Sequence, residues 1–377
     1  MAELKKCIVI PDSFKGTMSA IDVCCIMEES IRRVFPGCQV KSIPAADGGE
    51  GTVDCFLRAM NGEKRRVLTT GPYGESVEAY YAKLGDMAIL EMAQVAGLPQ
   101  VQGRLNPRRT TTYGLGEVIK AAIADGCRRI TIGLGGSCTN DGGMGAARAM
   151  GVRFLNGAGE EFAPAADEMT QIAHIDISAA QKKLEGIEVT AMCDITNPMY
   201  GETGAAYVFG PQKGADEDCV RLLDQNLRAL AEVIRRDLGV DVSQIPGAGA
   251  AGAFGAGIVA FFGGRLKSGI HTVLDITDFD RELEDAQLIF TGEGRVDAQS
   301  LQGKVLSGVA ERAGKAGVPV VVVAGACEPE ANQLYRHGVC GIFSTCRTAA
   351  GLDYQKAHSE ENLAAAMEGI LRLYAAV

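Results

Sequence analysis

The stretch GLGGSCTNDGG, Gly133 to Gly143, combines five glycines with small hydroxyls and an Asn-Asp pair. It follows the β-branched run Ile130-Thr131-Ile132 and precedes a helix-like run from Ala146 to Met150. Glycine at such a junction permits positive φ angles and a close approach of the backbone to a ligand. The N-terminus of the following helix offers free N–H groups and a partial positive charge. The stretch therefore predicts a strand-to-helix loop that cradles an anion.

The same alternation of strand, polar loop and helix recurs on both sides of this loop. Apolar runs at residues 6–10, 39–44, 129–133, 188–193, 287–290, 318–323 and 341–343 predict strands, and the segments 115–124, 217–238 and 360–374 predict helices. The segment 77–92 instead alternates like an antiparallel hairpin that turns at Gly85-Asp86. The pattern predicts an α/β protein with mainly parallel sheets. Because the middle differs from the two ends, we expect an outer domain of residues 1–72 and 280–377 with residues 73–279 inserted.

Composition narrows the class of protein. The chain has 377 residues and a formal net charge of −10, with no long basic run, which argues against nucleic-acid binding. Its 12 cysteines form no CxxC pair and its four histidines are scattered, so a reducing cytoplasm is expected and a zinc site is not. The segment 245–264 carries no charge, but its glycine content favours a buried helix over a membrane span.

Four further polar blocks carry candidate functional residues, most of them following predicted strands, where α/β proteins bind ligands. PDSFKGT and ADGGEGT contain lysine and carboxylates suited to an anion and a metal ion. The stretch from DITNP to GPQKGA and the block TGEGRVDAQSLQGK add acids, hydroxyls and cations. The candidates in these blocks are Asp12, Ser13, Lys15, Asp47, Glu50, Asp194, Lys213, Glu293, Arg295, Asp297, Ser300 and Lys304. Each block could also serve only as a turn or a helix cap.

Taken in order, these blocks resemble the bacterial class I glycerate kinases. The resemblance runs from about residue 7 to about residue 345 and rests on eight blocks in register: PDSFKGT, ADGGEGT, GGSCTNDGG, CDITNP, FGPQKGA, GAGAAG, LKSGI and TGEGRVDAQSLQGK. It implies ATP-dependent phosphorylation of D-glycerate in a cleft between two α/β domains. It further implies a restriction-enzyme-like outer domain and a flavodoxin-like inserted one.

Phosphoryl transfer requires positioning and neutralisation of charge, and this assigns hypothetical roles to the candidates. Gly135, Gly136, Ser137, Thr139, Asn140, Asp141 and Lys213 would bind the nucleotide, mainly through backbone N–H groups of the loop. Lys15, Arg295 and Lys304 would clamp glycerate and the transferred phosphoryl group. Asp194, with Asp47 or Glu50, would hold Mg²⁺ or act as the base. Asp12, Ser13, Glu50, Glu293, Asp297 and Ser300 would bind substrate.

Two alternatives stay open at this point: a kinase for another small hydroxy acid, or a non-catalytic module that senses a nucleotide or a sugar acid. We expect 2-phosphoglycerate rather than 3-phosphoglycerate as the product. The expected partners are small molecules, with no nucleic acid and no membrane. The residues leave the oligomeric state open, a homo-oligomer included.

Overall fold

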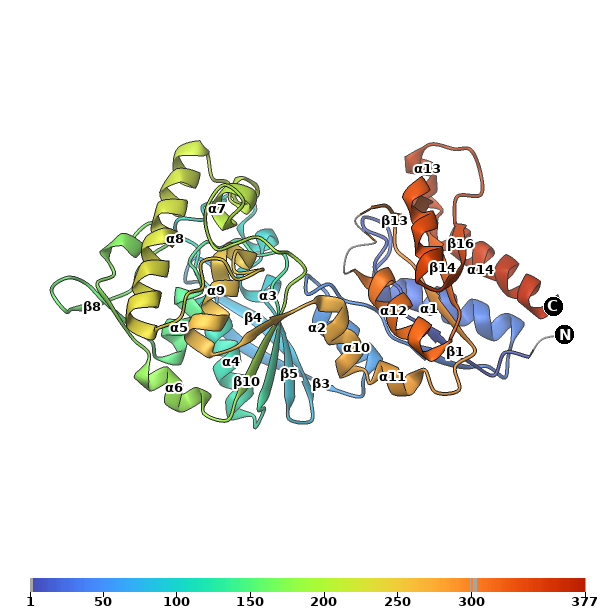
Figure 1. Ribbon diagram of the computed structural model, residues 1–377, viewed down its shortest axis with the longest axis horizontal. Coiled ribbons are helices and arrows are strands. Elements are labelled where there is room, and N and C mark those ends of the chain that lie inside the picture. Colours follow the sequence, from blue (N-terminus) through green and yellow to red (C-terminus); the bar gives the residue numbers. More distant parts are fainter. Residues whose placement is uncertain (1–2, 299, 301–303, 377) are drawn as a thin grey trace. The chain divides into compact units, whose positions relative to one another are not determined.

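The computed structural model describes residues 3–298, 300 and 304–376 of the chain, which form two compact units. Unit 1 comprises Met1–Asp47, Asp54–Asn61 and Ser268–Val377, and unit 2 comprises Gly48–Val53 and Gly62–Lys267. Both units contain strands that alternate with helices, as Figure 1 shows. The α/β class with mainly parallel sheets is confirmed. The domain boundaries expected near residues 72 and 280 stay a prediction.

The core of unit 1 is a parallel sheet of five strands in the order β16-β14-β12-β1-β2. The strands are β1 (Lys6–Val9), β2 (Gln39–Ser42), β12 (Leu288–Thr291), β14 (Val320–Ala324) and β16 (Val339–Ser344). Counted in chain order within the unit, this is the 2-1-3-4-5 order of flavodoxin-like sheets. The flavodoxin-like arrangement was expected in the inserted domain. That assignment is corrected, because the strand order places it in unit 1, which contains both chain ends.

Helices cover the sheet of unit 1. They are α1 (Ala20–Val34), α10 (Gly269–Ile276), α11 (Phe279–Glu282), α12 (Val305–Ala316), α13 (Leu352–Ala357) and α14 (Ser359–Ala376), with the 3-10 helix η4 (Pro329–His337). Helix α1 is capped by Ser19, whose hydroxyl accepts from the Asp22 N–H at 3.1 Å while the Asp22 carboxylate accepts from the Ser19 N–H. Its buried face joins one hydrophobic cluster with Leu363 and Met367 of α14.

The core of unit 2 is a six-stranded mixed sheet in the order β11-β10-β6-β5-β4-β3. The strands are β3 (Glu63–Thr70), β4 (Ser76–Leu84), β5 (Met87–Glu91), β6 (Arg129–Gly133), β10 (Glu188–Met192) and β11 (Arg265–Lys267). The predicted hairpin is confirmed as β4 and β5, which pair antiparallel. Strands β5, β6, β10 and β11 are parallel to one another. Their carboxyl ends therefore share one edge of the sheet.

The remaining elements of unit 2 surround this sheet. They are α3 (Ala93–Ala96), η1 (Leu98–Val101), α4 (Tyr113–Ala124), α5 (Met144–Met150), β7 (Arg153–Leu155), β8 (Glu161–Phe162), η2 (Met169–Gln171), β9 (His174–Asp176), α6 (Ser178–Leu184), α7 (Ala205–Phe209), η3 (Pro211–Lys213), α8 (Glu217–Leu238) and α9 (Ala250–Phe262). Helix α2 (Thr52–Ala59) crosses the boundary between the units in sequence. The predicted helix 217–238 is α8, which is capped by Asp216 and ends at Gly239 with φ of 70°.

The uncharged segment 245–264 forms the buried helix α9, as predicted. Among the described residues, no helix has both the length and the apolar character needed to cross a membrane. The first turn of α9 is not helical: Ala251, Gly252 and Ala253 have φ angles of 52°, 66° and 66°. Alanine in this left-handed region costs about 1–2 kcal/mol, so the surrounding contacts must hold the turn in place.

Candidate functional site

In unit 1, three predicted acids follow the neighbouring strands β1, β2 and β12: Asp12, Asp47 and Glu293. Strands β1 and β12 are adjacent and parallel, so Asp12 after β1 and Glu293 after β12 come to the same edge of the sheet. Burial raises the pKa of the Asp12 carboxyl, and the negative charge of Asp47 raises it further. Burial also raises the pKa of Glu293, and Asp12 adds to this effect. We call Asp12, Asp47 and Glu293 the acidic cluster.

One oxygen atom of the acidic cluster lacks a hydrogen-bond donor. Glu293 is 8% exposed, and its Oε1 atom is buried without a hydrogen-bond partner. Burial of an ionised carboxylate without a partner costs free energy, so such a group either binds a proton or pairs with a cation or a hydrogen-bond donor. The cluster is therefore suited to accept a proton, or to bind a cation or a hydrogen-bond donor of a ligand.

Two of the three predicted cations of unit 1 accompany the cluster. The Lys15 ammonium lies 3.6 Å from the Asp47 carboxylate, with 78% of the lysine side chain exposed. The Lys304 charge acts on Glu293 and lowers its pKa, in opposition to burial. Arg295 instead pairs with Glu328 at 2.7 Å. The structure thus brings Lys15 and Lys304 to the acidic cluster and gives Arg295 a partner elsewhere in unit 1.

The predicted substrate-binding hydroxyls serve turns next to the cluster. The Ser13 N–H donates to the Asp12 carboxylate at 2.6 Å. Ser300 is buried, and its hydroxyl accepts from the Asp297 N–H at 3.1 Å. These bonds fix the loop that follows Arg295. Within the same predicted block, residues 299 and 301–303 lie outside the described residues.

In unit 2, the glycines of the Gly133–Gly143 loop allow close packing of backbone on backbone. The Gly135 N–H donates to the Gly48 carbonyl at 2.9 Å, and a Cβ on Gly135 would lie 2.6 Å from the Gly49 Cα. Gly136 is exposed and has φ of 73°. The predicted ADGGEGT block therefore supports the loop from one side. Gly135, expected to donate to a phosphate, already donates to protein.

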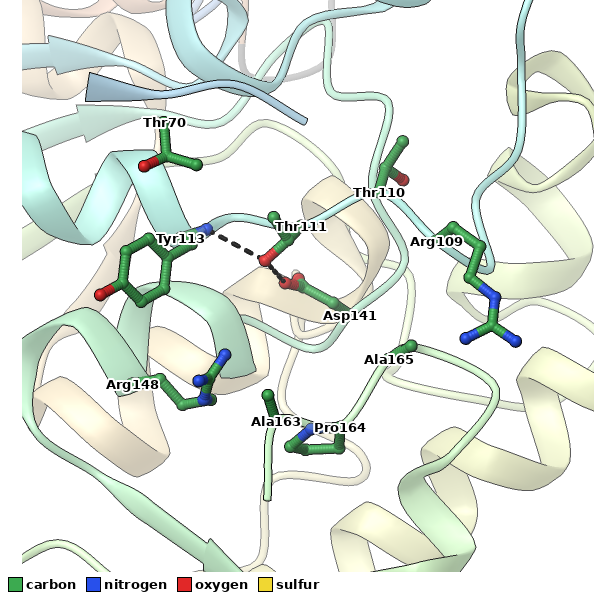
Figure 2. A pocket seen from close by; sticks show the side chains of 10 residues that line it. All are labelled: Thr70, Arg109, Thr110, Thr111, Tyr113, Asp141, Arg148, Ala163, Pro164 and Ala165. Carbon is green, nitrogen blue, oxygen red and sulfur yellow. Dashed lines mark hydrogen bonds between the residues drawn. The ribbon is translucent and has the colours of Figure 1, made fainter. Parts of the chain in front are cut away.

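Asp141 ties the loop to two helices. Its Oδ2 atom accepts from the Thr112 N–H at 2.8 Å and the Thr112 hydroxyl at 2.9 Å, at the start of α4. The same carboxylate accepts from the N–H groups of Gly143 and Gly145 at the start of α5, at 3.1 and 3.2 Å. Figure 2 shows Asp141 beside Thr111. Protein donors occupy both oxygens, so we assign Asp141 a positioning role rather than contact with a nucleotide.

Lys213 is a buried cation beneath the loop. It is 2% exposed, and its ammonium donates to the Ser137 hydroxyl at 3.0 Å and the Thr139 carbonyl at 2.7 Å. Burial lowers its pKa to about 8. The hydroxyl of Thr139 and both amide atoms of Asn140 are buried without hydrogen-bond partners. We call Ser137, Thr139, Asn140 and Lys213 the loop cluster.

The left-handed turn of α9 supports the loop cluster. The Gly142 N–H donates to the Gly252 carbonyl at 3.0 Å, and a Cβ on Gly252 would lie 1.9 Å from the Thr139 carbonyl oxygen. Only glycine fits this close approach at a positive φ. The contact gives the uncharged Gly/Ala segment, which the sequence left without a role, a place under the loop.

Unit 2 contains two further predicted acids, Asp194 and Glu50, and another acid, Glu91, that the sequence analysis missed. Asp194 is exposed directly after β10, and Glu50 is exposed on the turn before α2. Glu91, at the end of β5, is buried and accepts hydrogen bonds from the N–H groups of Gly51 and Val53. It thereby anchors the ADGGEGT block. A single carboxylate in the apolar run Met87–Met92 was the signal that could have identified it.

Carboxylates in unit 1 fit a hard cation that is bound partly through water. Within the described part of the chain, no group of three or more His, Cys, Asp and Glu side chains is arranged to hold a metal ion. Mg²⁺ commonly uses only one or two carboxylates, and substrate phosphates and water complete its coordination. The buried, partnerless Glu293 Oε1 beside Asp12 matches that donor chemistry.

The acidic cluster and the loop cluster both lie at the carboxyl ends of parallel strands. Such an arrangement defines an α/β enzyme for anionic small molecules. The chain matches the model of the glycerate kinase family over residues 7–375 and belongs to that family. It is therefore an enzyme of the kinase class.

Individual relatives agree with this membership. A glycerate kinase from Bacillus cereus is 43% identical over 361 residues, which cover 95% of each chain. A glycerate 2-kinase from Escherichia coli K12 is 40% identical over 368 residues, covering 97% of each. A crystal structure assigned provisionally to glycerate kinase 2 from Salmonella typhimurium LT2 matches with a TM-score of 0.88 and 39% identity, over 99% of both chains.

Proposed function

We propose that this chain phosphorylates D-glycerate with ATP and yields 2-phosphoglycerate. Family membership supports a kinase acting on glycerate, and the Escherichia coli relative's name, glycerate 2-kinase, supports the 2-hydroxyl as acceptor. The observation that carries the proposal is the acidic cluster with its buried, partnerless Glu293 Oε1 atom. As part of the proposal, ATP and glycerate meet in a cleft between an outer and an inserted domain.

The acidic cluster supplies the base in this proposal. A carboxylate with a raised pKa is a stronger proton acceptor than an ordinary one. Asp12 and Glu293 both have raised pKa values and sit beside each other. One of them would take the proton of the glycerate hydroxyl as the new O–P bond forms. This moves the role of base from Asp194, Asp47 or Glu50 to the buried pair.

Cations neutralise the charge that phosphoryl transfer brings together. Lys15 and Lys304, next to the acidic cluster, would bind the glycerate carboxylate and the transferred phosphoryl group. Mg²⁺, when bound, would neutralise phosphate oxygens; Asp47 and Glu293 are the carboxylates we propose for it, with Asp194 as a further candidate. Lys213 and Asn140 of the loop cluster would position the nucleotide. Arg295 would contribute only after leaving Glu328.

Release of ADP that requires D-glycerate tests the proposal. The product is then examined by phosphorus NMR, which separates 2-phosphoglycerate from 3-phosphoglycerate. A panel of related hydroxy acids, tartronate included, tests substrate choice. ADP release that is equal with and without D-glycerate, or a better rate with another acid, would overturn the proposed substrate. A 3-phosphoglycerate signal would overturn the proposed acceptor hydroxyl alone.

Asp12→Asn tests the assignment of the base, and Asp353→Asn is the matched control. Asp353 is an exposed acid of the same unit, on α13, and its loss changes the net charge equally. We expect Asp12→Asn to lower kcat by about 10²–10⁴, the range of general-base catalysis, and the control to leave it unchanged. An Asp12→Asn enzyme with normal kcat would leave Glu293 as the base.

A further inference from the structure

A pocket in unit 2 is lined by two arginines, and none of the residues assigned above to glycerate lines it. Its volume is about 370 Å³, and Arg109, Thr111, Tyr113, Asp141, Arg148 and Pro164 are among the residues that line it. Figure 2 shows Arg109 and Arg148 on opposite sides of this space, with Asp141 between them. The volume is at the lower end of the range for small-molecule sites. The ligand must therefore be small.

Arg148 is a half-buried cation for which the described residues provide no carboxylate. Its guanidinium lies 5.7 Å from the centre of the Tyr113 ring, which holds it over an aromatic face. A guanidinium withdrawn from water normally pairs with an acid. Arg148 differs in this respect from Arg153 of the same unit, which pairs with Glu161 at 2.8 Å.

The acids near the pocket leave the charge of Arg148 unpaired among the described residues. The Asp141 carboxylate already accepts hydrogen bonds from Thr112 and from the N–H groups at the start of α5. Arg109 contacts Asp167 and Glu168, each at 3.4 Å, while Asp167 has a closer partner in Arg108 at 2.7 Å. The residues that line the pocket thus include two guanidinium groups and one carboxylate, whose oxygens already accept hydrogen bonds from protein donors. The lining has a net positive charge although the whole chain is acidic.

We propose that this pocket, which we call the Arg109–Arg148 pocket, binds the phosphate group of a small anion. Guanidinium forks match the oxygens of phosphate, and two of them match its double charge better than that of a single carboxylate. The ligand is either inorganic phosphate or a phosphorylated hydroxy acid. Through Asp141, the pocket adjoins the end of the Gly133–Gly143 loop, so its occupancy would stabilise the starts of α4 and α5.

Calorimetric titration of the full chain tests this site without ATP or glycerate, and the Arg148 variants separate binding in the pocket from binding of 2-phosphoglycerate at the proposed catalytic site. Inorganic phosphate and 2-phosphoglycerate are titrated separately at constant ionic strength. We expect binding that Arg148→Gln weakens at least about tenfold, the scale of a lost charged hydrogen bond. Arg148→Lys keeps the charge without the fork and should give an intermediate loss. Equal binding of both ligands identifies the phosphate group as sufficient, and binding of phosphoglycerate alone identifies the phosphorylated acid.

Two control variants localise the binding. Arg153→Gln removes the same charge from another surface of unit 2, and Lys5→Ala removes an exposed charge of unit 1 that lies outside the acidic cluster. Both should bind like the wild type, and circular dichroism verifies that every variant is folded. The proposal is overturned if neither ligand binds at millimolar concentration, if Arg148→Gln and Arg148→Lys bind normally, or if a control variant loses binding equally.

Discussion

Replacement of Lys213 by methionine removes a charge that the fold holds out of water. The ammonium is 2% exposed, and its pKa is lowered from 10.5 to about 8 by burial. Between these two values the unfolded chain keeps a proton that the folded chain has lost. The free energy of unfolding of the wild type therefore rises with pH across this window. A tenfold change in proton affinity corresponds to about 1.4 kcal/mol, so the total rise is about 3 kcal/mol.

The difference between wild type and Lys213→Met isolates this effect, since all other titrating groups are shared. Urea unfolding is followed by far-UV circular dichroism from about pH 7.5 to about pH 10.5, because the chain has no tryptophan. Relative to the variant, the wild type should gain about 3 kcal/mol over that range. Lys183→Met, which removes an exposed lysine of unit 2, is the matched control. A difference between wild type and Lys213→Met that stays constant, or falls with rising pH, would refute the reasoning.

Three shorter predictions concern the other parts of the site. Lys15→Ala should lower kcat/KM by about 10²–10³ without changing the free energy of unfolding. Lys5→Ala, which removes a lysine from a similarly exposed ion pair, should change neither quantity. A loss in kcat/KM below about threefold for Lys15→Ala would show that Lys15 does not belong to the site. Glu293→Gln should lower kcat yet raise the free energy of unfolding at neutral pH, because the raised pKa of the Glu293 carboxyl makes the folded state lose stability as pH rises. Glu330→Gln, at an exposed glutamate, is the control and should change neither quantity. A Glu293→Gln variant that is less stable than the wild type would contradict the argument. Gly252→Ala should lower the melting temperature more than Gly263→Ala, since both have positive φ but only Gly252 is crowded; equal melting temperatures would count against the close contact with Thr139.

Periodicity and capping patterns were sufficient for most elements of the fold. The apolar spacing of α8 and the Gly85-Asp86 turn are local signals, and each appears where it was predicted. The short strand β11 was not predicted. Its three residues, Arg265–Lys267, alternate exposed and half-buried positions and gain their place only by pairing with β10. Such a strand carries no local signal.

The sequence predicted which residues belong to the candidate site better than it predicted the role of each residue. Sequence order placed Asp12 and Glu293 after strands, but their adjacency depends on β1 pairing with β12, which no local pattern encodes. The loop glycines were expected to serve an anion, whereas Gly135 packs on Gly48 and Gly49. Asp141 was expected to bind a ligand, but five protein donors already bond its carboxylate. These tasks follow from tertiary packing, which residue type alone does not reveal.

The central position of β1 in its sheet has a consequence for synthesis. Cys7 of β1 faces Val40 on one side and Leu288 on the other, so one neighbour is made early and the other about 280 residues later. At roughly 5–20 residues per second, the ribosome needs about 14–56 s to close that interval. During this time one edge of β1 has no strand to pair with, and unpaired edges recruit other chains. Nascent chains interrupted before β12 are thus the forms most exposed to aggregation.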